Sequence, residues 1–134
     1  KKSNTYEGLV SLTDIYATVA AMTGVEIPVG EAIDSKAFIP VLSGDMSFQT
    51  RDNMVHQSSG GMYAITSGAW KYIDGLGSGG FTFPTNLTPE PNGPKGQLYQ
   101  LSEDPLESEN LFATYPEMIP SLKKQLEAIK NKEK

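Results

Sequence analysis

Four short runs of alternating apolar and polar residues between positions 54 and 111 constrain the fold of this chain most strongly. Such runs, when rich in aromatic and branched residues, are typical of strands, and a Ser-Gly pair between two of them predicts a hairpin. We therefore predict a small antiparallel sheet of about four strands. The runs cover residues 54–57, 62–66, 69–73 and 97–101.

The N-terminal part of the chain is predicted to form an amphipathic helix over residues 11–23. Ser11 and Asp14 resemble a capping box at its start, and Gly24 stands where a left-handed residue ends a helix. Apolar residues recur along it at helical spacing, and we expect them to form a stripe that is buried in a core. The stripe comprises Leu12, Ile15, Tyr16, Val19 and Met22.

Two further helices are expected. Asp34 and Ser35 are placed to cap the first, which Pro40 limits to about two turns because proline lacks a backbone donor. Thr114 and Glu117 form a capping box for the second, a long helix near the C-terminus. The apolar face of that long helix consists of Met118, Ile119, Leu122, Leu126 and Ile129.

These elements predict an α+β fold, with a four-stranded antiparallel sheet packed against the long C-terminal helix and the N-terminal helices. At 134 residues the chain has the length of a single domain, which we place at 1–134. The chain begins with Lys1 instead of a methionine and runs directly into a helix. We therefore expect it to be a fragment of a longer protein.

Composition excludes several classes of function. A net charge of −5 argues against non-specific binding of nucleic acid, which requires a basic face. The absence of cysteine excludes disulfides, thiol catalysis and Cys-ligated zinc. No apolar run approaches the roughly 20 residues of a membrane-spanning helix. We therefore expect neither a nucleic acid nor a membrane as a partner.

Few residues point to chemistry on their own. His56 is the single histidine, and without a visible base, nucleophile or metal co-ligand a structural role at a strand end is favoured. The glycine-rich run 76–80 fits a flexible loop better than a nest of backbone amides for an oxyanion. The acidic run 103–117 is interpreted as a turn with a solvated face. Trp70 is interpreted as a core anchor in preference to a platform for sugars.

Several motifs occur in one order along the chain and carry a family resemblance. Residues 68–72 read Gly-Ala-Trp-Lys-Tyr, and residues 98–111 read Leu-Tyr-x-Leu-x-x-Asp-Pro-x-Glu-x-x-Asn-Leu. Upstream, residues 11–15 read Ser-Leu-Thr-Asp-Ile, and residues 55–58 read Val-His-Gln-Ser. This pattern resembles the C-terminal domain of the formylglycine-dependent, arylsulfatase-type sulfatases, and among them the bacterial polysaccharide-type members.

The resemblance implies a fold and a set of contacts. The fold is the C-terminal subdomain of the alkaline-phosphatase-like sulfatases, which closes one wall of the pocket for the sulfate ester. His56 would donate a hydrogen bond to a sugar hydroxyl or to the sulfate, and the glycine-rich loop would reach the substrate as well. The candidate substrate-binding residues are His56, Gln57, Ser58, Gly77, Ser78 and Gly79.

The resemblance also describes the parent protein. Its partners would be its own N-terminal α/β catalytic domain and a sulfated carbohydrate, its cofactors formylglycine and Ca2+, and its location periplasmic or secreted. This chain has no Cys/Ser-x-Pro-x-Arg segment, the precursor of formylglycine. We therefore assign no catalytic residue, metal ligand or cofactor to it and predict that the isolated chain is inactive. Two other functions stay open: a free-standing module that binds carbohydrate or anions, and an interaction domain without a ligand.

Overall fold

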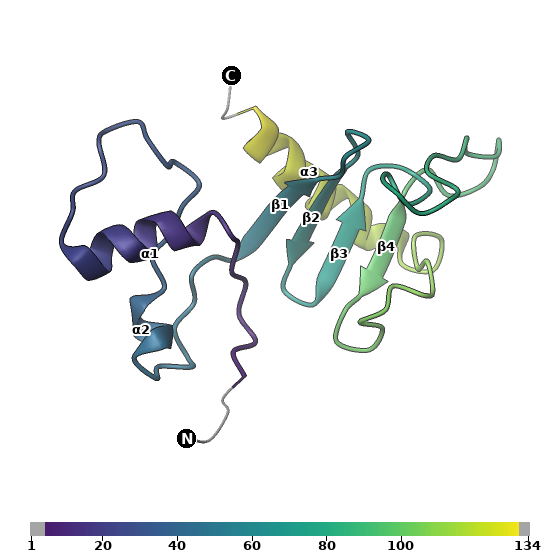
Figure 1. The fold of residues 1–134 in the computed structure, drawn as a ribbon. Coiled ribbons are helices and arrows are strands. Elements are labelled where there is room, and N and C mark those ends of the chain that lie inside the picture. The colour runs from purple at the N-terminus through teal and green to yellow at the C-terminus, as the bar shows by residue number, and fades with distance from the viewer. Residues whose placement is uncertain (1–4, 132–134) are drawn as a thin grey trace. The chain divides into compact units, whose positions relative to one another are not determined.

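The computed structural model describes residues 5–131, and the chain divides into two compact units, residues 1–52 and 53–134 (Figure 1). The single domain over 1–134 stays a prediction. The residues at the chain start, on which the expectation of a fragment rests, lie outside the described part. The N-terminal unit contains α1 (Asp14–Thr23) and α2 (Ile39–Leu42). The C-terminal unit contains β1 (Asn53–Gln57), β2 (Tyr63–Ser67), β3 (Trp70–Ile73), β4 (Gln97–Gln100), η1 (Pro116–Met118) and α3 (Ile119–Lys130).

The four strands form one antiparallel sheet in the order β1-β2-β3-β4. Because side chains alternate across a strand, the register decides which residues share a face. Ile65 lies opposite both Val55 and Tyr72, and Tyr72 lies opposite Leu98. The predicted sheet and the α+β class are therefore confirmed. β2 and β3 each begin one residue later than expected, and Gly68 adopts φ 56° in the turn between them.

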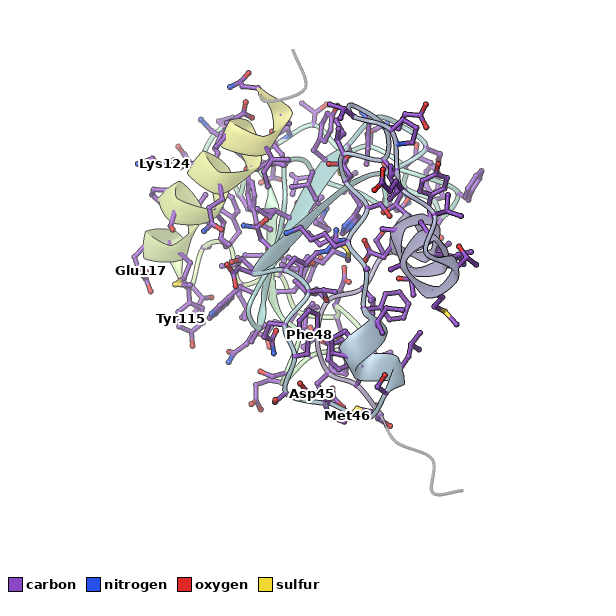
Figure 2. The ribbon with its side chains drawn as sticks, turned by 90° about the vertical axis from the view of Figure 1, so that its left-hand side faces the viewer. Asp45, Met46, Phe48, Tyr115, Glu117 and Lys124 are labelled. Carbon is purple, nitrogen blue, oxygen red and sulfur yellow. The ribbon has the colours of Figure 1, made fainter. Side chains whose placement is uncertain are left out.

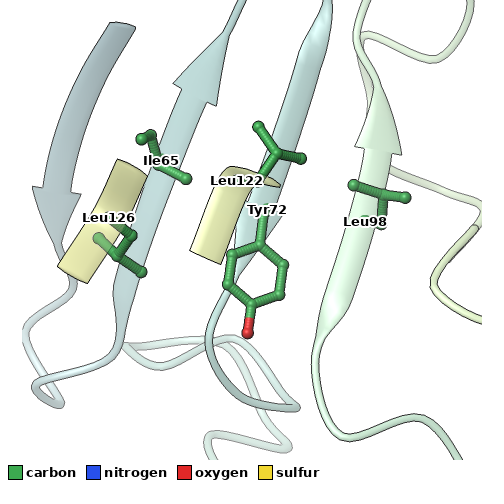
Figure 3. Packing of buried hydrophobic residues seen from close by; sticks show 5 residues of the cluster. All are labelled: Ile65, Tyr72, Leu98, Leu122 and Leu126. Carbon is green, nitrogen blue, oxygen red and sulfur yellow. The ribbon is translucent and has the colours of Figure 1, made fainter. Parts of the chain in front are cut away.

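One face of the sheet is covered by α3 and forms the hydrophobic core (Figures 1 and 3). Leu122 and Leu126 of the helix pack against a row of side chains that crosses β2, β3 and β4. That row is Ile65, Tyr72 and Leu98, all of which are buried. The predicted apolar face of the last helix is confirmed, since its remaining members also pack on this cluster. The opposite face of the sheet is not covered by α3.

The start of the last helix differs from the predicted capping box. The chain first forms the 3-10 turn η1, and no side-chain hydrogen bond caps either η1 or α3. The amides of Thr114 and Tyr115 both donate to the carbonyl of Leu111 at 3.0 Å, so a backbone turn replaces the expected side-chain cap. Glu117 and Lys124 point away from the strands (Figure 2). No helix of the described residues is long and apolar enough to cross a membrane.

The apolar stripe predicted to face a core from α1 is exposed, and this prediction was wrong. Leu12 is 85% exposed and Met22 is 66% exposed, and the three residues between them in the stripe are about half exposed. The buried residues of α1 are instead Asp14, Ala17 and Thr18. The helix begins at Asp14, three residues later than expected, whereas the left-handed Gly24 at its end is confirmed.

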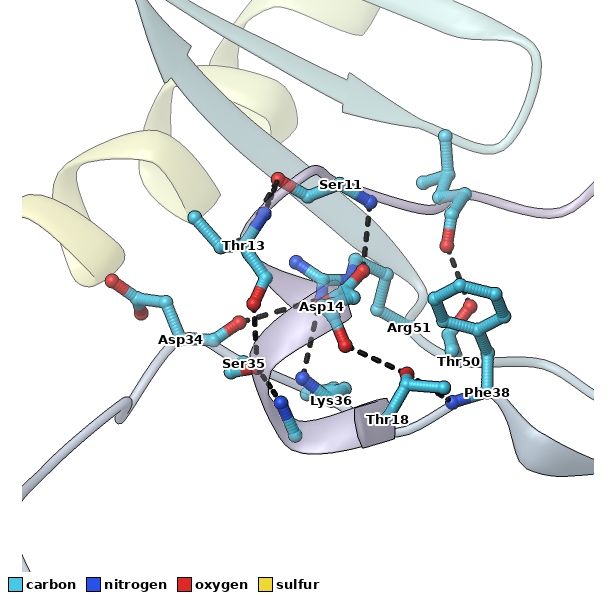
Figure 4. A network of polar contacts seen from close by, with 12 residues as sticks. Ser11, Thr13, Asp14, Thr18, Asp34, Ser35, Lys36, Phe38, Thr50 and Arg51 are labelled. Atoms are coloured by element: carbon cyan, nitrogen blue, oxygen red, sulfur yellow. Dashed lines mark hydrogen bonds and ion pairs between the residues drawn. The ribbon is translucent and has the colours of Figure 1, made fainter. Parts of the chain in front are cut away.

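A buried polar network explains why this face of α1 points inward (Figure 4). The Asp14 carboxylate pairs with the guanidinium of Arg51 and accepts the amides of Ser11 at 2.7 Å and Lys36 at 2.9 Å. The hydroxyl of Thr18 donates to the Asp14 carbonyl at 2.7 Å. Buried charges require such partners, so the network fixes which side of the helix is covered.

The second helix is shorter than predicted. α2 is a single turn of four residues with Pro40 near its start, and Asp34 and Ser35 do not cap it. The Ser35 hydroxyl instead donates to the Thr13 carbonyl at 2.6 Å and accepts the amide of Ala17 at 2.9 Å. Ser35 therefore ties its loop to α1 instead of starting α2, which begins only at Ile39.

Candidate functional site

A pocket with a cavity volume of about 680 Å³ lies on the sheet face opposite α3. Strand alternation identifies this face, because Ile65, Tyr72 and Leu98 point into the core and their neighbours along each strand point the other way. Every sheet residue that lines the pocket belongs to this second set. These residues are His56, Ala64, Lys71, Ile73, Gln97 and Tyr99.

The pocket brings together four of the six predicted substrate-binding residues, namely His56, Ser58, Gly77 and Ser78. Gln57 alternates to the other side of β1, and its amide nitrogen donates to the Gly61 carbonyl at 3.3 Å. The Gly79 carbonyl accepts the amide of Gly60 at 2.7 Å, so this residue joins two loops beside the pocket. Contact with substrate stays a prediction for all six residues.

His56 is held neutral by its surroundings. Its side chain is exposed at the end of β1, yet neighbouring atoms remove enough hydration to lower its pKa below the usual 6.5. The nearby charge of Lys71 lowers the pKa further, and Glu107 partly opposes both effects. A neutral imidazole carries one donor and one acceptor nitrogen, so His56 can give and take hydrogen bonds at neutral pH.

An ion pair in the pocket was missed by the sequence reasoning. Lys71 Nζ lies 2.5 Å from Glu107 Oε1, with 16% and 30% of the respective side chains exposed. The sequence predicted that Glu107 faces water in the acidic turn. This prediction was wrong, because Glu107 pairs with Lys71 in the pocket. The backbone of Glu107 has φ 55°, an uncommon value for a residue with a side chain. The alternation of side chains along the strands places Lys71 on the same face as His56. This alternation was the sequence feature from which the position of Lys71 could have been predicted.

Two further polar residues line the pocket next to this pair. In the register of β3 and β4, Tyr99 lies opposite Lys71 and Gln97 lies opposite Ile73. The Tyr99 hydroxyl donates to Gln97 Oε1 at 2.8 Å. Burial raises the pKa of Tyr99, and the nearby carboxylates raise it further, so its hydroxyl stays protonated at neutral pH. Hydrogen-bonding groups thus surround the ion pair.

The glycine-rich loop is tied down and does not form a free nest of amides. The amide of Ser78 donates to the Pro84 carbonyl at 3.0 Å, and that of Gly79 donates to the Thr85 carbonyl at 2.8 Å. The amide of Gly80 donates to the Ser78 hydroxyl at 3.2 Å. Three of the five amides in the run 76–80 therefore already have acceptors within the chain, which disfavours the oxyanion alternative. The flexibility of this loop stays a prediction.

The acidic run forms a turn, as predicted. The Asp104 carboxylate accepts the Ser108 hydroxyl at 2.6 Å and the Glu109 amide at 2.9 Å, and these two bonds lower the pKa of Asp104. Among the residues that the structure describes, no group of three His, Cys, Asp or Glu side chains could hold a metal ion. Trp70 packs on the core and meets Tyr115 edge-to-face at 5.5 Å, which confirms it as an anchor.

Comparison with known proteins identifies the family. No family model matches the chain. The N-acetylgalactosamine-6-O-sulfatase of Bacteroides thetaiotaomicron is 32% identical over 131 residues, which make up 98% of this chain and 25% of that protein. A solved structure described under the metabolism of multiple glycosaminoglycans by Bacteroides thetaiotaomicron has a TM-score of 0.72 and 31% identity, over 94% of this chain and 26% of that one. The chain is a sulfatase C-terminal domain.

Other relatives place this sulfatase domain in a wider group. Arylsulfatase K of Rattus norvegicus is 29% identical over 135 residues, covering 92% of this chain and 21% of that protein. A solved structure described as a complex with its substrate D-glucosamine-2-N,6-O-disulfate has a TM-score of 0.61 at 22% identity, which supports the fold alone. The sulfatase domain thus spans about a quarter of the length of the relatives that it matches.

Proposed function

We propose that this sulfatase domain is part of a longer sulfuric ester hydrolase that acts on a sulfated carbohydrate. In this protein, which we call the parent, the pocket on the open face of the sheet would form one wall of the substrate site. The observation that carries the proposal is the convergence of His56, Ser58, Gly77 and Ser78 on that pocket. The names of the relatives support a sulfated sugar as the substrate class.

The chemical step is assigned to the rest of the parent. This chain contains no Cys/Ser-x-Pro-x-Arg segment, and its described residues offer no cluster that fits a metal ion. The residues present therefore do not fit formylglycine or Ca2+, and both belong to the N-terminal α/β domain in this proposal. The sulfatase domain alone would be inactive, and the parent would be periplasmic or secreted, as the family resemblance implies.

The exposed stripe of α1 supports a missing partner domain. Ile15, Tyr16, Val19 and Met22 lie on α1, Leu12 lies two residues before its start, and each of the five is at least half exposed. Contiguous apolar patches of this kind mark interaction surfaces in soluble proteins. Because the matched relatives are about four times as long as the aligned region, we assign the catalytic domain of the parent as the partner that covers this stripe.

His56 is given the role of a substrate hydrogen-bonding residue. In the parent, His56→Ala is expected to lower kcat/KM for a sulfated sugar about five- to tenfold, since one hydrogen bond contributes roughly 1 kcal/mol and 1.4 kcal/mol is a factor of ten. Steady-state kinetics measure this. Gln57→Ala is the comparison variant, and a smaller loss is expected because the Gln57 amide already donates to Gly61. A loss of twofold or less in His56→Ala would refute the assignment.

A free-standing carbohydrate-binding module is the second candidate, and the same pocket favours it. It differs from the first in needing no partner domain. Isothermal titration of the 134-residue chain with sulfated sugars would favour the module if it gave micromolar affinity. We expect weak binding, because one wall of a site makes only part of the contacts that the complete site makes.

A further inference from the structure

Two phenylalanine side chains project into solvent from the loop beside the pocket. Phe81 is 97% exposed and Phe83 is 90% exposed. Burying such a ring contributes roughly 1.5–3 kcal/mol, so two exposed rings that are separated by a single residue indicate a surface that receives a partner. Of the two rings, Phe83 lines the pocket, together with its neighbours Thr82 and Pro84, whereas Phe81 does not.

The loop that carries these rings is tied together by backbone hydrogen bonds. Leu87 donates to the Leu76 carbonyl at 3.0 Å, and the amides of Ser78 and Gly79 donate to the carbonyls that follow Phe83. At Gly77, where φ is 96°, an added Cβ would lie 2.7 Å from the Thr85 carbonyl oxygen. Glycine is therefore required for the two sides of the loop to approach this closely.

The same loop is hydrogen-bonded to β4, one of the strands that form the floor of the pocket. The side-chain amide of Gln97, on β4, donates to the carbonyls of Gly75 at 3.0 Å and Gly77 at 2.9 Å. On the other side, Gly60 donates to the Gly79 carbonyl at 2.7 Å. These bonds hold the backbone of the loop that carries Phe83 against the strand residues. A loop backbone that is preorganised in this way loses less conformational freedom when a ligand binds.

We propose that Phe83 is a stacking platform for a sugar ring that enters the pocket. This inference rests on the proposed function, in which the pocket receives a carbohydrate. A pyranose has an apolar C–H face and a rim of hydroxyl groups. The exposed ring of Phe83 matches the apolar face, while Lys71, Glu107 and Tyr99 offer donors and acceptors for the rim.

The floor also indicates which part of the sugar it takes. Because the charges of Lys71 and Glu107 are paired, the floor near them carries no net charge. An unsulfated, hydroxyl-bearing part of the sugar suits such a floor better than a second anionic group, which would meet the Glu107 carboxylate. The platform therefore recognises the sugar and leaves the sulfate ester to the remainder of the site.

Phe81 provides a matched control on the same loop. In the parent, Phe83→Ala is expected to raise KM about fivefold or more for the best-cleaved member of a panel of monosulfated N-acetylhexosamines. Phe81→Ala should leave that KM within twofold. Hydrolysis of 4-nitrophenyl sulfate, which has no sugar, should stay within twofold in both variants, because the platform contacts only the non-reacting part of the substrate. Phe83→Tyr should restore the KM for the sugar.

Three other results would overturn the platform or the proposed function. Equal effects of Phe81→Ala and Phe83→Ala on thermal stability, with no change in KM, would show that the rings pack on protein and would overturn the platform. An unchanged KM in Phe83→Ala, while His56→Ala still lowers kcat/KM, would overturn the platform and leave the proposed function standing. A parent that cleaves no sugar of the panel would overturn both.

Discussion

Replacing Asp14 by alanine is expected to lower the free energy of unfolding of the N-terminal unit by about 3–5 kcal/mol, since removal of one partner leaves a buried charge unpaired. Asp14 is fully buried, and the side chain of Arg51 is only 10% exposed. The substitution would leave the Arg51 guanidinium and the amides of Ser11 and Lys36 without their shared acceptor.

Urea unfolding of the 134-residue chain, followed by circular dichroism, measures this effect. Asp34→Asn is the matched control, because Asp34 is exposed and contributes its backbone carbonyl to the network, which the substitution retains. It should change the free energy of unfolding by no more than about 0.5 kcal/mol. If Asp14→Ala were as mild as this control, the network would not be what orients α1, and the exposure of its apolar stripe would need another cause.

Leu126→Ala is expected to lower the free energy of unfolding of the C-terminal unit by about 2–5 kcal/mol. Leu126 is fully buried and lies in the cluster with Ile65, Tyr72 and Leu98. Truncation removes apolar burial and leaves a cavity between α3 and the sheet. Because α3 supports one face of the sheet and the pocket lies on the other, this substitution should also weaken substrate binding in the parent.

Lys124→Ala is the control on the same helix. Lys124 is exposed and points away from the strands, so we expect a change within about 0.5 kcal/mol (Figure 2). Hydrogen exchange at the amides of β2 and β3 adds a local measurement, and faster exchange is expected there in Leu126→Ala alone. A loss below about 1 kcal/mol in Leu126→Ala would mean that the helix contributes little to holding the sheet.

The parts of the fold that sequence predicted well are those governed by local patterns. Alternation gives the four strands to within one residue, and apolar spacing gives the buried face of α3. The same spacing failed for α1, because periodicity identifies an apolar face without showing what covers it. The partners that decide the matter, Asp14 and Arg51, lie 37 residues apart in the sequence.

The candidate site was predicted only in part for a similar reason. His56, Ser58, Gly77 and Ser78, which line the pocket, were predicted from the family resemblance. The pair of Lys71 and Glu107 joins residues 36 apart and depends on a left-handed backbone at Glu107, which no periodic pattern indicates. The engaged amides of the glycine-rich loop depend on carbonyls beyond Phe83, in a stretch without regular secondary structure.

The most direct measurement is a sulfatase assay of the 134-residue chain beside the parent, with 4-nitrophenyl sulfate as substrate and calcium present. We expect turnover by the parent and none by the sulfatase domain alone, because the domain has no Cys/Ser-x-Pro-x-Arg segment. Turnover by the isolated chain would contradict the proposal that the chemical step belongs to the rest of the parent. Silence of the parent toward both this ester and sulfated sugars would contradict the assignment to a sulfuric ester hydrolase.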